Sequence, residues 1–202
     1  WVVFFFLTRA MRFKQKSLSL DKPRIMGILN VTPDSFSDGG RFVNLDDALI
    51  QTEQMVADGA SIIDIGGEST RPGAKEVSLQ EELDRVIPVI EAINNRFDIV
   101  ISIDTSKAQV MTQAVAAGAG LINDVCALQL EGALEAAANS GAPVCLMHMQ
   151  GEPRTMQKSP SYNDVVKDIK AFLQARMDDC IAAGINKSQL IIDPGFGFGK
   201  SL

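Results

Sequence analysis

The sequence has few of the residues from which metal centres and disulfide frameworks are built. It contains one histidine and three cysteines in 202 residues, and no two cysteines are spaced as CxxC. This argues against a structural zinc site, which needs about four closely spaced cysteine or histidine ligands. The odd cysteine count, with two of the three in apolar runs, predicts buried, reduced thiols in a cytoplasmic protein.

Basic charge is also scarce. The chain contains 19 Lys and Arg residues and 25 Asp and Glu residues, which gives a formal net charge of −6. A general nucleic-acid binder or a binder of anionic membranes needs a basic face, so we expect neither partner. A small anionic ligand is still compatible with this composition, because a site can be locally positive in an acidic protein.

An uninterrupted apolar run occupies residues 1–7. It is too short to span a bilayer, and it lacks the basic flank and cleavage site of a signal peptide. We expect residues 1–20 to be a lead-in outside the domain, with residues 1–10 either upstream read-through or a disordered segment. A membrane-surface anchor is the weaker alternative. Residues 21–202 are then expected to form one domain.

From residue 25 onward one unit recurs, in which a short apolar run ends in polar residues and is followed by a helical pattern and a glycine. The apolar runs predict strands over residues 25–31, 61–66, 99–104, 120–125, 143–149 and 190–193. Helices are predicted from residue 45 to about 56, after the capping box of Ser78 and Glu81, and over residues 107–117, 132–139 and 164–183. This alternation predicts a parallel α/β sheet.

Nearly every predicted strand carries a polar side chain at or near its carboxyl end. These residues are Asn30, Asp64, Asp104, Asn123, His148 and Asp193. A ring of polar groups supplied by all the strands is typical of the active face of a TIM (β/α)8 barrel. A dinucleotide-binding open sheet is the alternative, but G-x-G-x-x-G is absent after the first strand. About six of the eight βα units of a barrel are present, so we expect two more beyond Leu202.

Three of these strand-end residues, Asp104, Asn123 and Asp193, are the first candidates for a binding site. A carboxylate at the end of a buried strand is unfavourable unless it is paired, although each residue could instead cap a helix. Together, two carboxylates and an amide could accept hydrogen bonds from the N–H edge of a heterocycle and stabilise positive charge on it. His148 is expected to be a core or rim residue rather than a base.

Two loops add candidate ligand contacts. The loop after the first strand presents Phe36, and the loop after the second carries Arg71, whose planar guanidinium suits phosphate or carboxylate. Ordinary turns are the alternative for both loops. The Gly-Lys-Ser tripeptide at residues 199–201 is similar to a nucleotide-binding P-loop, but Pro194 stands where that motif needs its first glycine, so ATP binding is rejected.

Six segments together resemble the dihydropteroate synthase family. They occur in the family's order and spacing from about residue 24 to the end, and the first two are long and specific. The segments are residues 27–40 (GILNVTPDSFSDGG), 64–73 (DIGGESTRPG), 104–106 (DTS), 123–125 (NDV), 146–149 (LMHM) and 193–200 (DPGFGFGK).

The resemblance implies a pterin-binding TIM barrel over residues 21–202. Its reaction joins 6-hydroxymethyl-7,8-dihydropterin diphosphate to p-aminobenzoate and releases pyrophosphate. Asp104, Asn123 and Asp193 would hold the pterin, and Met147 would line its pocket. Asn30 would help to hold Mg²⁺ and the diphosphate.

The resemblance also assigns the second half of the site. The residues that would form the aminobenzoate and pyrophosphate sites are Phe36, Asp38, Thr70, Arg71, Pro72 and Phe198. Mg²⁺ and Arg71 would take up the charge of the departing diphosphate. The pterin methylene cation left behind would be stabilised by Asp104, Asp193 and Asp38.

The family pattern carries two further expectations. Its later Ser-Arg-Lys and Arg-x-His segments and most of its dimer contacts would lie beyond Leu202, so we expect little or no turnover from this chain and a homodimer only for a full-length protein. The alternatives are a pterin-binding methyltransferase domain, which the two loops around Phe36 and Arg71 disfavour, and an inert pterin-binding fragment. Sulfonamide should displace ligand from a synthase and not from a methyltransferase.

Overall fold

A computed structural model of the chain describes residues 2–4, 10–32, 45–69, 76–151, 156 and 160–200. Parallel strands follow one another in a curved sheet, each hydrogen-bonded to its neighbour in sequence. They are β4 (Arg24–Asn30), β5 (Ala60–Gly66), β6 (Val100–Asp104), β7 (Leu121–Asp124), β8 (Val144–Met147) and β9 (Leu190–Asp193). The short β1 (Val2–Phe4) pairs antiparallel with β4. The six parallel strands form a half-barrel of the TIM type, which confirms the predicted fold class and each predicted strand to within two residues.

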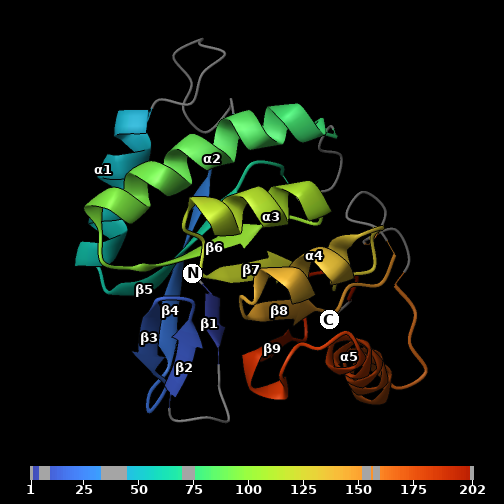
Figure 1. Cartoon of the computed structure of the whole chain (residues 1–202). Helices are drawn as coiled ribbons and strands as arrows, with labels where there is room; N and C mark the ends of the chain where they lie inside the picture. The colour runs from blue at the N-terminus through green and yellow to red at the C-terminus, as the bar shows by residue number, and fades with distance from the viewer. Residues whose placement is uncertain are drawn as a thin grey trace.

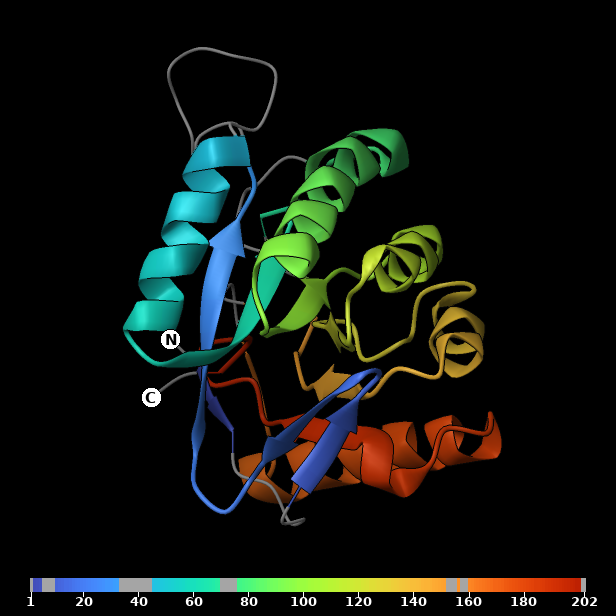
Figure 2. The same cartoon turned by 60° about the vertical axis from the view of Figure 1, so that its left-hand side comes forward.

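The connections between the parallel strands are helical, as predicted. The helices are α1 (Leu45–Ala57), α2 (Leu79–Arg96), α3 (Ala108–Ala117), α4 (Ala133–Ser140) and α5 (Val165–Ala182), with a 3-10 turn η2 (Lys187–Gln189) before β9. Ser78 caps α2 by accepting a hydrogen bond from the backbone N–H of Glu81, which satisfies one of the free donors of the first turn. Figures 1 and 2 show the helices in an arc around the outside of the sheet.

The two faces of the sheet are buried in two different cores, because side chains alternate along each strand. Residues such as Leu29, Ile63 and Ile101 face outward and pack against the helices. The alternate residues face the inside of the half-barrel and form a second core, made of Met26, Ile62, Val100, Leu121, Cys145 and Ile191. The inner core fills the amino end of the half-barrel, which leaves the carboxyl ends of the strands for polar side chains.

A β-hairpin covers the inner core at the amino end. Its strands are β2 (Ala10–Phe13) and β3 (Lys16–Ser19), and it contributes Met11 and Phe13, of which Phe13 is only 1% exposed. Lys16 fixes the hairpin by donating from Nζ to the carbonyl oxygen of Ile99 over 2.7 Å. The hairpin thus packs against the core of the domain, although it precedes residue 21, where the sequence predicts that the domain begins.

The cysteines lie as the sequence predicts in two of three cases. Cys145 and Cys180 are buried free thiols, whereas Cys126 is half-buried. Burial raises the pKa of both buried thiols, so they are kept in the unreactive protonated form. Among the helices that the structure describes, none is long and apolar enough to cross a membrane.

Candidate functional site

Strand pairing brings four of the predicted strand ends into one row at the carboxyl end of the half-barrel. Asn30 pairs with Gly66, Gly66 with Asp104, and Asp104 with Asn123. A Cβ atom on Gly66 would lie 3.5 Å from Asp104 Oδ2 and 3.6 Å from Asn30 Oδ1. Glycine at this point therefore leaves the space between the two polar side chains open.

Asp64 lies one layer below this row, inside the half-barrel. Asp64 is only 4% exposed, and its Oδ2 accepts a hydrogen bond of 3.0 Å from Asn123 Nδ2. Ser102 is its register partner on β6. Among the residues that the structure describes, Asp64 Oδ1 and Ser102 Oγ are buried without a hydrogen-bond partner. The site therefore includes the buried carboxylate of Asp64, to which the sequence analysis assigns no binding role.

Burial raises the pKa of the two acidic groups of the site, Asp104 and Asp64. Burial raises the pKa of Asp104 well above its ordinary value, and the nearby charges of Asp64, Asp124, Glu82 and Glu68 raise it further. Burial also raises the pKa of Asp64, although the neighbouring Ser102 and Asn123 side chains lower it. Both carboxyls can therefore hold a proton at a pH where ordinary carboxyls have lost theirs. Such a site suits a ligand rich in N–H donors or one that develops positive charge.

Asp124, the next residue along β7, has a different role. It is fully buried and accepts hydrogen bonds from the Ser106 hydroxyl and from the backbone N–H groups of Cys126 and Leu128. Burial raises its pKa, although these hydrogen bonds lower it. Its carboxylate is thus occupied in shaping the loop after β7.

Met147 and Asp193 are register partners at the ends of β8 and β9. Asp193 Oδ1 accepts a hydrogen bond of 2.7 Å from the Gly195 N–H, which starts the loop that carries Phe198. A Cβ atom on Gly195, at φ +66°, would lie 2.1 Å from the His148 carbonyl oxygen, so only glycine fits there. Met147 is buried and Phe198 is half-buried at this end of the sheet.

Lys200 holds that loop in place. Its Nζ donates to the carbonyl oxygens of His148, Gly195 and Phe198 over 3.1, 2.8 and 2.8 Å. The lysine of the Gly-Lys-Ser tripeptide is therefore engaged with backbone, in agreement with the rejection of a nucleotide-binding P-loop. His148 is buried, with its ring edge-on to Phe172 at 5.0 Å between centroids, as expected of a core residue.

An ion-pair cluster lies beside the row, at the start of the loop after β5. Lys107, ahead of α3, donates from Nζ to both Glu68 and Glu82, and Thr105 donates to Glu82 over 2.6 Å. Glu82 is 1% exposed, so its charge depends on these partners. Burial lowers the pKa of Lys107, but the hydrogen bonds to Glu68 and Glu82 raise it by more. Sequence analysis missed this cluster, which we call the Lys107 cluster (Lys107, Glu68, Glu82 and Thr105).

Some of the predicted site residues cannot be placed. Phe36, Asp38, Thr70, Arg71 and Pro72 lie outside the residues that the structure describes. Their assignments therefore stay predictions. The Lys107 cluster fixes the chain on both sides of residues 70–75, because Glu68 Oε1 also accepts a hydrogen bond from the Val77 N–H over 3.4 Å.

A metal ion at this end of the sheet would need ligands beyond those that the described residues supply. In the described part of the chain, no group of three or more His, Cys, Asp or Glu side chains is arranged to hold one. Asn30 is exposed at the end of β4, with an amide oxygen that Mg²⁺ accepts. Because Mg²⁺ is commonly held by one or two protein oxygens together with substrate phosphates and water, Asn30 fits a magnesium ion that arrives with a phosphate ligand.

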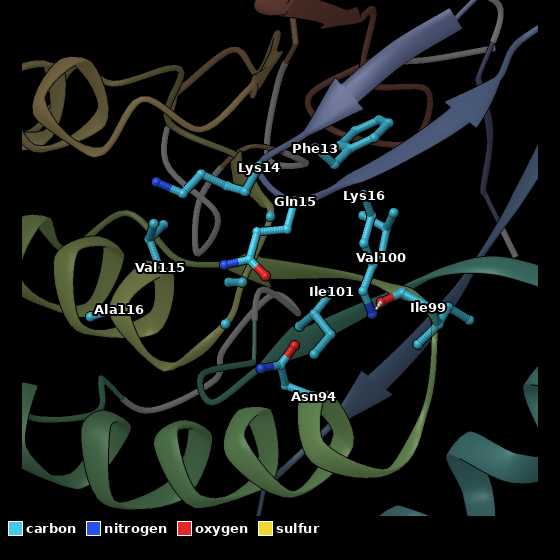
Figure 3. Close-up of a pocket in the computed structure, with 13 residues that line it drawn as sticks. Phe13, Lys14, Gln15, Lys16, Asn94, Ile99, Val100, Ile101, Val115 and Ala116 are labelled. Atoms are coloured by element: carbon cyan, nitrogen blue, oxygen red, sulfur yellow. Dashed lines mark hydrogen bonds between the residues drawn. The ribbon is translucent and has the colours of Figure 1, made fainter.

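A cavity of about 160 Å³ lies at the opposite end of the half-barrel. Figure 3 shows the hairpin residues Phe13 to Lys16 facing Asn94 and the start of β6 around this cavity. The Lys16 ammonium group donates hydrogen bonds to the backbone carbonyl oxygens of Phe97 and Ile99 there. The Lys14 ammonium group likewise donates to the carbonyl oxygen of Ser140 over 2.8 Å. The predicted catalytic side chains are at the other end of the strands, so this cavity is separate from the candidate site.

The sequence matches the model of one protein family, described as pterin binding enzyme, over residues 26–202. It is 62% identical over 187 residues to the dihydropteroate synthase of Haemophilus influenzae, covering 93% of this chain and 68% of that protein. It is 57% identical over 186 residues to the dihydropteroate synthase of Escherichia coli, covering 92% of this chain and 66% of that one. The chain thus spans about two thirds of the length of these relatives.

Solved structures agree in fold. A Yersinia pestis dihydropteroate synthase in complex with a sulfonamide drug matches with a TM-score of 0.88 at 61% identity, covering 93% of this chain and 68% of that one. A Xanthomonas albilineans dihydropteroate synthase with 4-aminobenzoic acid matches with a TM-score of 0.88 at 51% identity, covering 96% of this chain and 68% of that one.

Proposed function

We propose that this chain, which belongs to the pterin-binding enzyme family and within it to the dihydropteroate synthases, binds 6-hydroxymethyl-7,8-dihydropterin diphosphate at the carboxyl end of its half-barrel. The observation that carries the proposal is the row of Asp104 and Asn123 above the buried Asp64. Carboxylate and amide oxygens accept hydrogen bonds from N–H groups, and a pterin presents several such donors along one edge. Asp193 and Met147, at the ends of β9 and β8, complete this pterin site.

The reaction is a displacement at the methylene carbon of the pterin. The bond between this carbon and a diphosphate oxygen breaks, and the electron pair leaves with the diphosphate. The aniline nitrogen of p-aminobenzoate forms the new C–N bond and releases a proton to solvent or to a nearby carboxylate. Asp104 and Asp193 stabilise the positive charge that develops on the pterin.

Mg²⁺ would be held by Asn30 and the diphosphate oxygens, and when bound it neutralises charge on the leaving group. We propose that Arg71 binds the same diphosphate, and that Phe36, Asp38, Thr70, Pro72 and Phe198 form the aminobenzoate side of the site. Phe198 has the clearest structural support, because Lys200 fixes its loop against His148. The Yersinia pestis and Xanthomonas albilineans relatives bind a sulfonamide drug and 4-aminobenzoic acid, which supports an aminobenzoate site here.

The same relatives favour a synthase over a pterin-binding methyltransferase. A homodimer of the full-length protein is part of the proposal by family resemblance alone, and so is a cytoplasmic location.

The test is pterin-dependent condensation. Chain, Mg²⁺, pterin diphosphate and p-aminobenzoate are mixed, and both released pyrophosphate and dihydropteroate are measured. In parallel, binding of the pterin diphosphate is titrated and then competed with a sulfonamide. We expect pterin diphosphate to bind, and D104N and D193N to weaken its binding at least about tenfold, since each removes a charged hydrogen-bond acceptor. The exposed Asp58, in the turn that follows α1, provides D58N as a control that should bind like the wild type.

A chain that folds and binds no pterin diphosphate would overturn the proposal. Binding of pterin together with transfer of a methyl group from a reduced folate would favour the methyltransferase alternative. Product formation would show in addition that this chain is sufficient for turnover, contrary to the expectation of little or none.

A further inference from the structure

The Asn123 side chain has a defined orientation, and Asp64 sets it. Asn123 Nδ2 donates to Asp64 Oδ2 over 3.0 Å, from β7 to β5. An ionised carboxylate has acceptors only, so the NH2 group of Asn123 must face it. The carbonyl oxygen of Asn123 is then directed away from Asp64.

Turning the amide over would be unfavourable. Asn123 Nδ2 satisfies Asp64 Oδ2, and among the described residues Asp64 Oδ1 is buried without a hydrogen-bond partner. An inverted Asn123 would remove that donor from a buried charge and place its own oxygen lone pairs against the carboxylate. Asp64 is 4% exposed, so water cannot substitute freely for the lost donor.

We propose that Asp64 is a positioning residue that fixes Asn123 with its carbonyl oxygen toward the ligand, so that the site presents acceptors side by side and selects a heterocycle with adjacent N–H donors. This inference rests on the proposed function, and it concerns which edge of the pterin the site prefers. Asp104 on the neighbouring strand presents further acceptors in the same row, in register with Asn123.

The surrounding charges fit this arrangement. The groups that face Asp64 from the neighbouring elements are Ser102 and Asp104 on β6 and Asn123 on β7. None of them is a cation that could attract the Asn123 carbonyl in place of its NH2 group. The ammonium group of Lys107, in the cluster beside the row, is bound to Glu68 and Glu82.

The test is a double-mutant cycle on pterin binding, with unsubstituted pterin as the probe and calorimetry as the readout. In D64N, the new side-chain NH2 group can donate to the Asn123 carbonyl and so allow the inverted amide. We expect D64N to weaken pterin binding about tenfold in mildly alkaline buffer, where Asp64 carries its charge. In an N123A background, D64N should change the affinity by less than about twofold, because Asp64 acts through Asn123.

Controls separate positioning from loss of stability. D124N changes an equally buried aspartate whose carboxylate shapes the loop after β7, so it should lower the melting temperature while leaving the pterin affinity within about twofold. Equal weakening by D64N in both backgrounds would overturn the inference, and so would a D124N effect as large as that of D64N.

A second readout needs no ligand and no catalytic competence. The side-chain amide signal of Asn123, identified by its loss in N123A, should move in nitrogen–proton correlation spectra of D64N, whereas the signal of the exposed Asn94 should not. An unmoved Asn123 signal would overturn the inference directly. A different result separates the two proposals. If the wild type binds no pterin but the Asn123 signal still moves in D64N, the proposed function is overturned and the Asp64–Asn123 contact is supported.

Discussion

Asn123 of β7 reaches across β6 to donate its side-chain amide to Asp64 of β5, over 3.0 Å. The two residues are 59 positions apart in the sequence, and their strands are not neighbours in the sheet. The contact forms because the inner face of the sheet is concave, so that side chains from alternate strands converge. This convergence gives the carboxyl end of the half-barrel its concentration of acceptors.

Replacing Asp104 should stabilise the protein while it weakens ligand binding. Its pKa is raised in the folded state by burial and by the neighbouring carboxylates, so the folded protein holds this proton more tightly than the unfolded chain. That contribution is fully present below the unfolded carboxyl pKa of about 3.9 and is lost as pH rises through the folded pKa. At neutral pH, D104N should therefore melt higher than the wild type, by about 2–4 °C for each kcal/mol gained.

The measurement is the melting temperature of both proteins as a function of pH, with D58N alongside as an exposed control. The advantage of D104N should shrink as pH falls through the raised folded pKa of Asp104, and it should be lost below the unfolded carboxyl pKa of about 3.9. A D104N protein that is less stable than the wild type at neutral pH would contradict the electrostatic description of the site.

Breaking the Lys107 cluster should be costly. In K107M the buried Glu82 loses its ammonium partner, and an unpaired buried charge costs about 3–5 kcal/mol. The matched control is K167M, because Lys167 pairs with Asp164 on the surface with its side chain 83% exposed, and such pairs contribute about 0–1 kcal/mol. Denaturant unfolding of both variants measures the difference. Similar small losses in the two variants would show that Glu82 does not depend on Lys107.

The N-terminal hairpin should be part of the cooperative fold. Phe13 is 1% exposed in the inner core, so F13A should cost about 3–5 kcal/mol of unfolding free energy. Phe196 is 86% exposed, and F196A should change stability by no more than about 0.5 kcal/mol. If F13A unfolds like the wild type, the domain boundary at residue 21 predicted from sequence is the better description.

Two glycines of the loop after β9 provide a matched pair. Both have positive φ, but a Cβ atom on Gly195 would meet the His148 carbonyl oxygen at 2.1 Å, whereas a Cβ atom on Gly197 would have nothing within 4 Å. G197A should therefore cost about 1 kcal/mol for backbone strain alone. G195A should cost clearly more, because the loop must move away from β8, and it should also weaken aminobenzoate binding through Phe198. Equal losses in thermal unfolding would contradict this close packing.

The sequence was sufficient for the strands, the helices and the position of three candidate site residues at one edge of the sheet. Apolar runs and glycines located the parallel strands, and polar residues at strand ends pointed to Asp104, Asn123 and Asp193, because the carboxyl ends of parallel strands meet at one edge. Ser78 indicates the start of α2 for an equally local reason, because its hydroxyl accepts a hydrogen bond from the backbone N–H three positions along the chain.

The rest depended on contacts between distant segments. Asp64 was visible as a carboxylate within an apolar strand, but its partner is fixed only by the curvature of the sheet. The Lys107 cluster joins the end of β5, α2 and the start of α3, and no local pattern specifies that meeting. The sequence predicts a lead-in over residues 1–20, although Met11 and Phe13 alternate with exposed residues as a strand requires.

The central claim is that a pterin binds at the carboxyl end of the half-barrel, and the most direct measurement is to map where it binds. Unsubstituted pterin is titrated into the isotope-labelled chain, and changes are followed in nitrogen–proton correlation spectra. We predict that the signals of Asp104, Asn123 and Asp193 move with a common affinity, while those of Gly118 and Gly120, which line the cavity at the amino end, stay in place. Changes confined to that cavity, or no saturable change at all, would contradict the account.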